Sequence, residues 1–328
     1  MPPYIIGVMP TTEEAQARLA AIPNLTVSAS TPLAPYTRFG IGGPADLYVE
    51  TGDAEAFIAA LKEAKATGLE TVVIGDGTNL IVSDLGFRGI VLRYRADRLQ
   101  SAGRCVMADA GAVLLDLVDY TISIGLKGLE TLAGIPGSVG AAVYGNAGAY
   151  GHSISERVVR VRFYDGAEVR LFTNEQCRFE YRESIFKQEK DWIIFSTELA
   201  LDPADAAELR RRADEIVKIR NEKFPLTMKC AGSIFKNLIL NHLAPQVAAR
   251  VPLAVVREGK VPSAYFLEQV GAKGSGRGGI RVADYHANLI YNTGGGTAAD
   301  LRALIADLKA RVRDHFGLEL EEEVQYVG

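Results

Sequence analysis

Cysteine is scarce in this chain of 328 residues, and Cys105, Cys177 and Cys230 lie far apart in the sequence. An odd, scattered set predicts neither a disulfide framework nor a zinc site, and it is typical of a reducing compartment. Histidine is also scarce, with four residues. Because no histidine or cysteine has the spacing of metal ligands, we expect no metal site.

The sequence also lacks a long apolar run and an excess of basic residues. Asp116 and Asp119 interrupt the best candidate for a membrane span. The N-terminus, Met-Pro-Pro-Tyr-Ile-Ile-Gly, has no basic region before its short apolar run, which makes it a poor signal peptide. The formal net charge of −4 gives no support to nucleic-acid binding. We therefore expect a cytoplasmic protein that binds neither membranes nor nucleic acid.

Apolar residues make up 48% of the chain, which is enough for packed cores, and the length predicts two or three domains. Strand, helix, strand, loop and strand alternate over residues 45–82, which indicates an α/β unit. From apolar periodicity and turn signals we expect strands at 45–50, 71–74, 80–82, 105–110, 192–201, 286–292 and 318–327, and a hairpin within 157–172 around Asp165-Gly166.

Helix boundaries are predicted from capping residues. Asp53 is expected to cap a helix that ends at Gly68, and Thr297 to cap the final helix. Asp202-Pro203 has the form of a helix start, with the helix running to about residue 219. Ser263 is expected to cap a short helix to Val270. Further helices are expected at 112–124 and within the poorly specified lead-in, 1–30.

Two glycine-rich segments stand out. Gly75-Asp76-Gly77-Thr78-Asn79-Leu80 has half of a dinucleotide fingerprint, but a strand follows it where that motif needs a helix. It is not a P-loop, and alone it is most simply an ordinary strand connection. Eight glycines between Gly125 and Gly151 are accompanied by Ile, Val and Tyr, so this block is no flexible linker. It favours a ligand that lies against the main chain.

Six motifs in order make the chain resemble the UDP-N-acetylenolpyruvoylglucosamine reductase family over residues 33–328. The motifs are 37–43, 75–80, 128–151, 179–184, 231–237 and 321–324. The resemblance implies an α+β protein with the FAD-binding fold of the vanillyl-alcohol oxidase and p-cresol methylhydroxylase type. Two α/β subdomains (1–97, with the lead-in 1–32, and 98–203) would bind FAD, and a third α+β domain (204–328) would bind substrate.

The resemblance also implies the reaction. NADPH would reduce FAD, and the flavin would reduce UDP-N-acetylglucosamine enolpyruvate to UDP-N-acetylmuramate, a step in the synthesis of peptidoglycan precursors. None of the four histidines lies at a family attachment site, so FAD would be non-covalent. The implied FAD contacts are Arg38, Gly42, Gly75, Asp76, Gly77, Thr78, Asn79, Leu80, Gly134, Ile135, Pro136, Gly137, Ser138, Gly140, Ala141, Asn146, Gly148, Ala149 and Tyr150.

Three residues match the family's catalytic positions. Arg182 would polarise the substrate carboxylate, Ser233 would deliver a proton to carbon, and Glu323 would act as general acid or orienting group. From the residues alone, each has an ordinary alternative: a surface salt bridge for Arg182, a turn or cap for Ser233, and a solvated acidic run for Glu323.

Substrate contacts also follow from the resemblance. Tyr181, Lys223 and Asn237 match positions that hold the UDP-sugar, and His286 and Asn288 match a strand that faces the substrate. For His286, an ordinary core or surface histidine is an equal alternative. From charge alone, the loop with Lys273, Arg277 and Arg281 is a candidate for the phosphates of NADPH.

The chain departs from the family's usual pattern at two positions, with Glu322 where proline is common and Gln325 where a basic residue is common. No tyrosine lies between Arg182 and Arg220, which resembles the second type of the family, the one without an extra tyrosine-bearing loop. We expect a monomer. The rival interpretations are an oxidase of the same superfamily, without the catalytic set, and a non-catalytic sugar-nucleotide binding protein, which would be colourless.

Overall fold

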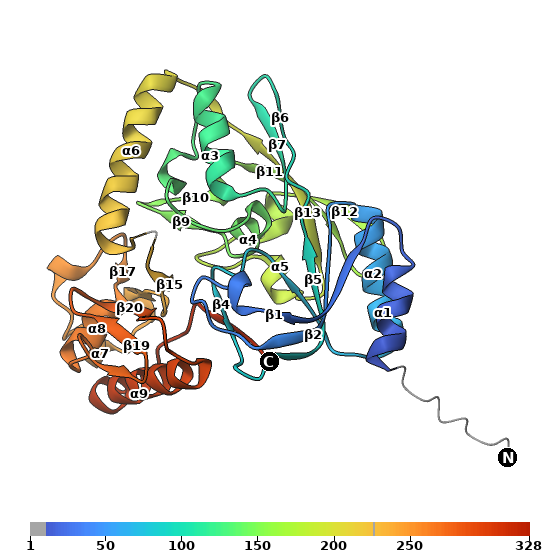
Figure 1. The fold of residues 1–328 in the computed structure, drawn as a ribbon. Coiled ribbons are helices and arrows are strands. Elements are labelled where there is room, and N and C mark those ends of the chain that lie inside the picture. Colours follow the sequence, from blue (N-terminus) through green and yellow to red (C-terminus); the bar gives the residue numbers. More distant parts are fainter. Residues whose placement is uncertain (1–10, 226) are drawn as a thin grey trace, which may run out of the picture.

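The computed structural model describes residues 11–225 and 227–328. The N-terminal heptapeptide considered above lies outside the described residues. The chain forms three main sheets, with the C-terminal helices at one end and the N-terminal helices at the other (Figure 1). Within the described part, no helix is both long and apolar enough to cross a bilayer.

The first sheet has the order β1-β2-β5-β3, in which β1 is antiparallel to β2 and the remaining neighbours are parallel. Alternate residues of β2 face opposite sides: Leu47 and Val49 pack with the helices, whereas Tyr48 belongs to a second apolar cluster. The elements are α1 (Thr12–Ala20), β1 (Thr26–Pro32), β2 (Pro44–Thr51), α2 (Ala54–Thr67), β3 (Thr71–Ile74) and β5 (Phe87–Tyr94).

The second sheet is antiparallel throughout, in the order β12-β11-β13-β7-β6. The largest apolar cluster packs helices α3 and α4 against it. The hairpin predicted at Asp165-Gly166 is confirmed, with Gly166 at a φ of +95°. The elements are β6 (Leu99–Ala102), β7 (Cys105–Asp109), α3 (Leu114–Ser123), α4 (Val139–Tyr144), β11 (Val158–Tyr164), β12 (Val169–Thr173), α5 (Ile185–Gln188) and β13 (Ile193–Ala200).

The third sheet, β15-β20-β19-β18, is also antiparallel and packs against α8 and α9. The final helix buries an apolar stripe formed by Leu301, Ile305, Leu308 and Val312. The elements are α6 (Ala206–Lys223), which leads into this part, β15 (Lys229–Ser233), α7 (Pro245–Ala248), α8 (Ser263–Gln269), β18 (Gly276–Arg277), β19 (Ile280–Ala283), β20 (His286–Asn292) and α9 (Ala298–Phe316).

Short two-stranded ladders connect these layers. They pair β8 (Leu126–Lys127) with β14 (Asp202–Pro203), β9 (Gly148–Ala149) with β10 (His152–Ser153), β16 (Leu238–Ile239) with β17 (Lys260–Val261), and β4 (Leu80–Val82) with β21 (Gln325–Val327). The last ladder is parallel, and it returns the C-terminal tail to the loop after β3. The tail strand is shorter than the predicted 318–327.

Capping predictions succeeded where the partner is local. Asp53 accepts hydrogen bonds at the start of α2, Gly68 ends that helix at a φ of +70°, and Thr297 caps α9. Two helix starts were wrong. Asp202 is ion-paired with Arg104 and Arg157, and Asp205 caps α6 instead, which runs to Lys223. Ser263 is the first residue of α8, and its hydroxyl donates to the carbonyl of Phe235.

Candidate active site

A cavity of about 280 Å³ lies where the two glycine-rich segments meet the β15 segment and the C-terminal tail. The three predicted catalytic residues, Arg182, Ser233 and Glu323, all line this cavity. The lining residues are Arg38, Thr78, Asn79, Leu114, Ile135, Pro136, Ser138, Ala141, Ala142, Gly145, Ala147, Gly148, Tyr181, Arg182, Arg220, Phe224, Ala231, Gly232, Ser233, Phe235, Asn237 and Glu323.

The two glycine-rich segments pack directly against each other. A Cβ on Gly75 would lie 2.9 Å from Ser138 Oγ, and a Cβ on Gly137 would lie 2.9 Å from Thr78 Oγ1. Gly77 has a φ of +62°, and a side chain there would overlap the carbonyl of Tyr36. Glycine is therefore required at Gly77 by the close approach of a backbone carbonyl, and at Gly75 and Gly137 the lack of a side chain lets the two segments pack together.

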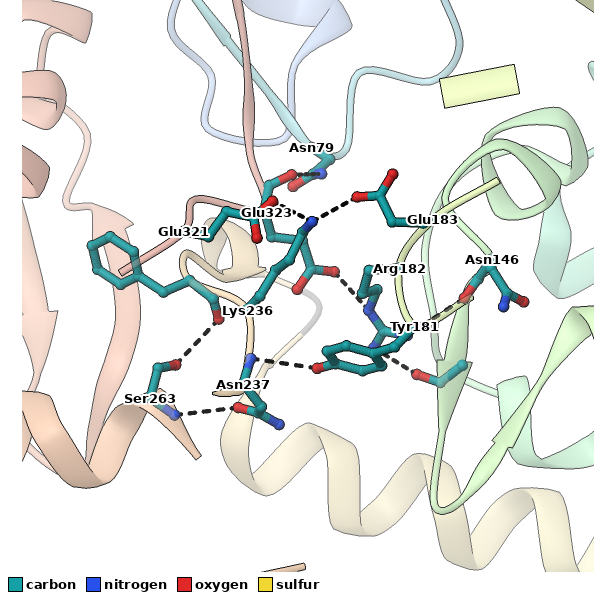
Figure 2. A network of polar contacts seen from close by, with 12 residues as sticks. Asn79, Asn146, Tyr181, Arg182, Glu183, Lys236, Asn237, Ser263, Glu321 and Glu323 are labelled. Atoms are coloured by element: carbon teal, nitrogen blue, oxygen red, sulfur yellow. Dashed lines mark hydrogen bonds and ion pairs between the residues drawn. The ribbon is translucent and has the colours of Figure 1, made fainter. Parts of the chain in front are cut away.

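Arg182 is held by a tight turn. Glu180 and Glu183 exchange backbone hydrogen bonds of 3.1 and 3.2 Å, and Arg182 between them has a φ of +59°. A left-handed backbone is uncommon for a residue with a long side chain and is typical of functional positions. The guanidinium donates to the carbonyl of Gly148 at 2.9 Å and to Glu323 Oε1 at 2.9 Å. Figure 2 shows this arrangement.

Glu323 reaches the cavity because the tail is held on both sides. Its backbone N–H donates to the carbonyl of Ile234 at 2.7 Å, and its carbonyl accepts from Asn79 Nδ2 at 2.7 Å. The residue thus bridges the loop after β3 and the β15 segment. Its carboxylate is left to face Arg182 (Figure 2).

In the acidic run 321–323, only Glu321 has a solvated side chain. Each glutamate pairs with a different cation: Glu321 with Lys236, Glu322 with Lys309 at 2.8 Å, and Glu323 with Arg182. The side chains of Glu322 and Glu323 are only 19% and 26% exposed. The unusual Glu322 therefore directs its charge to Lys309 and Tyr326, away from the cavity.

Ser233 is the last residue of β15, where it pairs with Leu289 of β20 after a bulge that begins at Cys230. Its neighbour Gly232 has a φ of +80°. Ser233 is thus a strand residue, and the alternative of a turn or helix cap is wrong. The bulge breaks the regular ladder and places this residue on the wall of the cavity.

Arg220, on α6, is a cavity residue that the sequence interpretation missed. Its Nε is buried and has no hydrogen-bond partner among the described residues. Burial, and then the nearby Arg38 and Arg182, lower the pKa of Arg220. A signal was present, because Leu209, Ala213, Ile216 and Arg220 follow one helical stripe, so a cation takes the place of the next buried apolar residue.

The charge of the cavity wall is unbalanced. Arg38, Arg182 and Arg220 line it, and Glu323 is the one acidic residue among the described lining residues. Buried cations without a protein partner are costly, so such an excess is typical of sites that bind anions. The geometry therefore favours ligands that carry phosphate or carboxylate groups.

Comparisons with known proteins agree with this geometry. Residues 45–171 match a family model described as FAD binding domain, and residues 224–327 match one described as UDP-N-acetylenolpyruvoylglucosamine reductase, C-terminal domain. The chain is 68% identical to the UDP-N-acetylenolpyruvoylglucosamine reductase of Solibacter usitatus, over 95% of this chain and 100% of that protein. It belongs to the UDP-N-acetylenolpyruvoylglucosamine reductase family.

More distant members of the family support the same assignment. The reductase of Bacillus subtilis is 34% identical, over 92% of this chain and 94% of its own length. The crystal structure of the reductase from Thermus caldophilus superposes with a TM-score of 0.71 at 27% identity, over 93% of this chain and 99% of that chain. The predicted α+β fold, with its FAD-binding part of the vanillyl-alcohol oxidase type, is confirmed.

The residues present fit the FAD that this family binds. Thr78 and Asn79 of the first glycine-rich segment and Ile135, Pro136 and Ser138 of the second line the cavity, and loops of this kind suit a pyrophosphate. The buried, unpartnered Nε of Arg220 offers a further donor for an anionic or carbonyl group. Among the described residues that line the cavity there is no histidine.

Not every predicted cofactor residue lines the cavity. Asp76 is ion-paired with Arg93 at 2.5 Å, and Asn146 uses its amide to donate to the carbonyl of Glu180 at 2.8 Å. Tyr150 is half exposed, with a φ of +53°. The other predicted contacts outside the lining are Gly42, Gly75, Gly77, Leu80, Gly134, Gly137, Gly140 and Ala149.

Two of the predicted substrate residues lie together at the cavity. The Tyr181 hydroxyl accepts from the backbone N–H of Asn237 at 3.4 Å, and its ring lies beneath Lys260, whose Nζ is 4.6 Å from the ring centroid. Asn237 Oδ1 in turn accepts from the N–H of Ser263 at 3.3 Å. Figure 2 shows the contacts that join Tyr181, Asn237 and Ser263.

The remaining predicted substrate residues are placed differently. Asn288 is 2% exposed, and its amide bonds to both backbone groups of Phe235. His286 has a buried Nδ1 without a partner among the described residues, and burial, and then Lys223, lower its pKa. In the basic loop, Lys273 pairs with Glu268 and Arg277 with Asp300, so a role with NADPH phosphates stays a prediction.

Proposed function

We propose that this chain reduces UDP-N-acetylglucosamine enolpyruvate to UDP-N-acetylmuramate, with FAD as cofactor and NADPH as reductant, in the synthesis of peptidoglycan precursors. The observation that carries the proposal is the meeting of Arg182, Ser233 and Glu323 at one cavity beside both glycine-rich segments. When bound, FAD supplies hydride transfer. The chain's own residues bind and orient the substrate and manage charge and protons.

Arg182 stabilises the charge that develops on the substrate. Hydride addition to the terminal carbon of the enolpyruvyl group produces a carbanion next to the carboxylate, better written as an enolate. A guanidinium stabilises this charge well because it is planar, permanently charged and able to form two parallel hydrogen bonds. Bonds to Gly148 and Glu323 fix its orientation before the reaction, so little reorganisation is needed.

Ser233 donates the proton that completes the reduction. Serine is a weak acid, so this role requires a strongly basic enolate and a well-placed hydroxyl, and a strand end on the cavity wall offers that placement. Glu323 orients the guanidinium of Arg182 through their hydrogen bond, or acts as a general acid in its own right.

Binding roles follow from position and charge. Arg38 and Arg220 neutralise anionic groups of cofactor or substrate, with the glycine-rich backbone beside them. Tyr181 and Asn237 hold the UDP-sugar, with Lys223 and His286 at the border of the site. Asn288 supports the backbone of Phe235 rather than the ligand, because its N–H groups donate to Phe235 and Ser263.

The finer assignments belong to the same proposal. The chain is of the second family type, has FAD-binding subdomains at 1–97 and 98–203 and a substrate domain at 204–328, and binds FAD without a covalent bond. Each main sheet comes from one stretch of sequence, which supports these borders. In this proposal the chain acts as a monomer in the cytoplasm.

The test is NADPH consumption by the purified yellow protein, with and without UDP-N-acetylglucosamine enolpyruvate. We expect oxidation to accelerate strongly only when that substrate is present. Equal oxidation without substrate, through oxygen, would favour the oxidase. A colourless protein that still binds the nucleotide sugar would favour a binding protein.

A further inference from the structure

Lys236 is a buried lysine that none of the catalytic or binding roles above uses. The residue is 7% exposed, which is rare for lysine unless its charge is paired. Its Nζ donates to Glu183 Oε1 at 2.6 Å and to Glu321 Oε1. Figure 2 shows the ammonium between the two carboxylates, beside the pair formed by Arg182 and Glu323.

The two partners of Lys236 belong to different parts of the site. Glu321 lies in the tail, which pairs with the Lys236 segment through backbone bonds: Lys236 N–H to Glu321 at 2.9 Å, and Glu323 N–H to Ile234 at 2.7 Å. Glu183 lies in the turn that holds Arg182 in its left-handed conformation. Ser233 and Glu323 lie on these two paired segments. The side chain of Lys236 therefore links both segments to the turn that carries Arg182.

Lys236 and Glu183 are both suited to remain charged. Burial alone would raise the pKa of Glu183, but hydrogen bonds from Lys236 and Lys187 lower it overall. Burial would lower the pKa of Lys236, but Glu183 and Glu321 raise it overall. Removal of Lys236 would leave the partly buried Glu183 paired with Lys187 alone. Lys187 follows Glu183 in the same segment, so this pair makes no link to the tail.

We propose that Lys236 is a positioning residue: through Glu183 it sets the placement of Arg182 relative to Ser233 and Glu323. This role rests on the proposed function, because it concerns the half-reaction in which the enolpyruvyl group is reduced and protonated. Reduction of the flavin by NADPH does not need Arg182 to face Ser233. Loss of Lys236 therefore acts on one half-reaction and spares the other.

The test compares Lys236→Met with Lys309→Met in the FAD-bound full chain. Lys309 is the matched control, because it pairs with Glu322 of the same tail but makes no link to the Arg182 turn. Flavin reduction by NADPH and flavin reoxidation by the enolpyruvyl substrate are measured separately under anaerobic conditions. We expect Lys236→Met to slow reoxidation by about tenfold or more, since small misplacements of reacting groups have large effects on rate.

The other variants complete the pattern. Lys309→Met is expected to match the wild type in both half-reactions, and Lys236→Arg to recover part of the lost rate. If Lys236→Met fails to retain flavin, Glu183→Gln tests the same link, because it removes the charge at the Arg182 turn while Lys236 keeps Glu321.

Each outcome decides between the two claims. Reoxidation by Lys236→Met at the wild-type rate, or equal slowing of both half-reactions, overturns the positioning role while the proposed function stands. If substrate fails to reoxidise the flavin of the wild type, the proposed function falls and the positioning role falls with it.

Discussion

Arg182 and Glu323 are 141 positions apart in the sequence, and their side chains meet at 2.9 Å on the wall of the cavity. Each is held by its own backbone: Arg182 by a tight turn with a positive φ, and Glu323 by bonds to Asn79 and Ile234. The pair thus joins the turn between Glu180 and Glu183 to the C-terminal tail. Its position depends on the whole fold, which makes it a sensitive point for mutation.

Glu323→Gln should slow reoxidation of the flavin by substrate. The amide keeps the size of the side chain but removes the charge that orients Arg182, and loss of a general acid or of an oriented charge costs about 100-fold or more. Reduction by NADPH should stay within about twofold of the wild type, measured by single-turnover kinetics. The control is Glu319→Gln, an exposed glutamate near the same tail. If Glu323→Gln and Glu319→Gln were reoxidised by substrate at the same rate, Glu323 would have no catalytic role.

Ser233→Ala should leave flavin reduction by NADPH intact and block reoxidation by the substrate. The hydroxyl is the proposed proton source, and the alanine side chain retains the strand geometry of β15. Stopped-flow spectra of the two half-reactions measure the effect, with Ser101→Ala, on the exposed strand β6, as control. Equal damage to both half-reactions would contradict the proton-donor role.

Local sequence signals located most helices and strands because the interactions behind these signals join residues that are close in the sequence. Asp53 and Gly68 mark the ends of α2 through groups within a few residues, so the boundaries were predictable. Asp202 has the same chemistry as a cap, but it pairs with Arg104 and Arg157, which come from distant parts of the chain. A single sequence does not reveal which of the two partners an aspartate will take.

The site required long-range information in the same way. The residues of the catalytic set were identified by their resemblance to a family, because spacing alone favours the ordinary alternative for each of them. The parallel pairing of β4 with β21 brings Asn79 to Glu323 across 244 positions, and no local pattern encodes that contact. Arg220 could have been found, since its place on the buried stripe of α6 is visible in the sequence.

Arg220→Met should weaken flavin binding without unfolding the protein. A buried guanidinium with an unpartnered Nε is expected to bond to the ligand, and hydrogen bonds to charged groups contribute about 1.5–3 kcal/mol. The dissociation constant of FAD, from fluorescence titration of the flavin-free protein, should rise about tenfold or more. Meanwhile, the melting temperature without flavin should stay level or rise, because the change removes a partly buried charge that has no ion pair among the described residues. Arg211→Met, exposed on the same helix, is the control.

His286 should make the stability of the fold depend on pH. Burial, and then Lys223, lower its pKa, so the folded state disfavours the proton that the unfolded state accepts. Above the unfolded pKa of about 6.5 both states are neutral and His286 has no effect. As pH falls below that value, the unfolded chain binds the proton first, and the free energy of unfolding decreases until the folded pKa is reached. Melting temperatures between pH 5 and 8 should therefore fall less steeply for His286→Gln than for the wild type. An identical slope for wild type and His286→Gln would show that His286 is protonated as easily in the folded state as in the unfolded one.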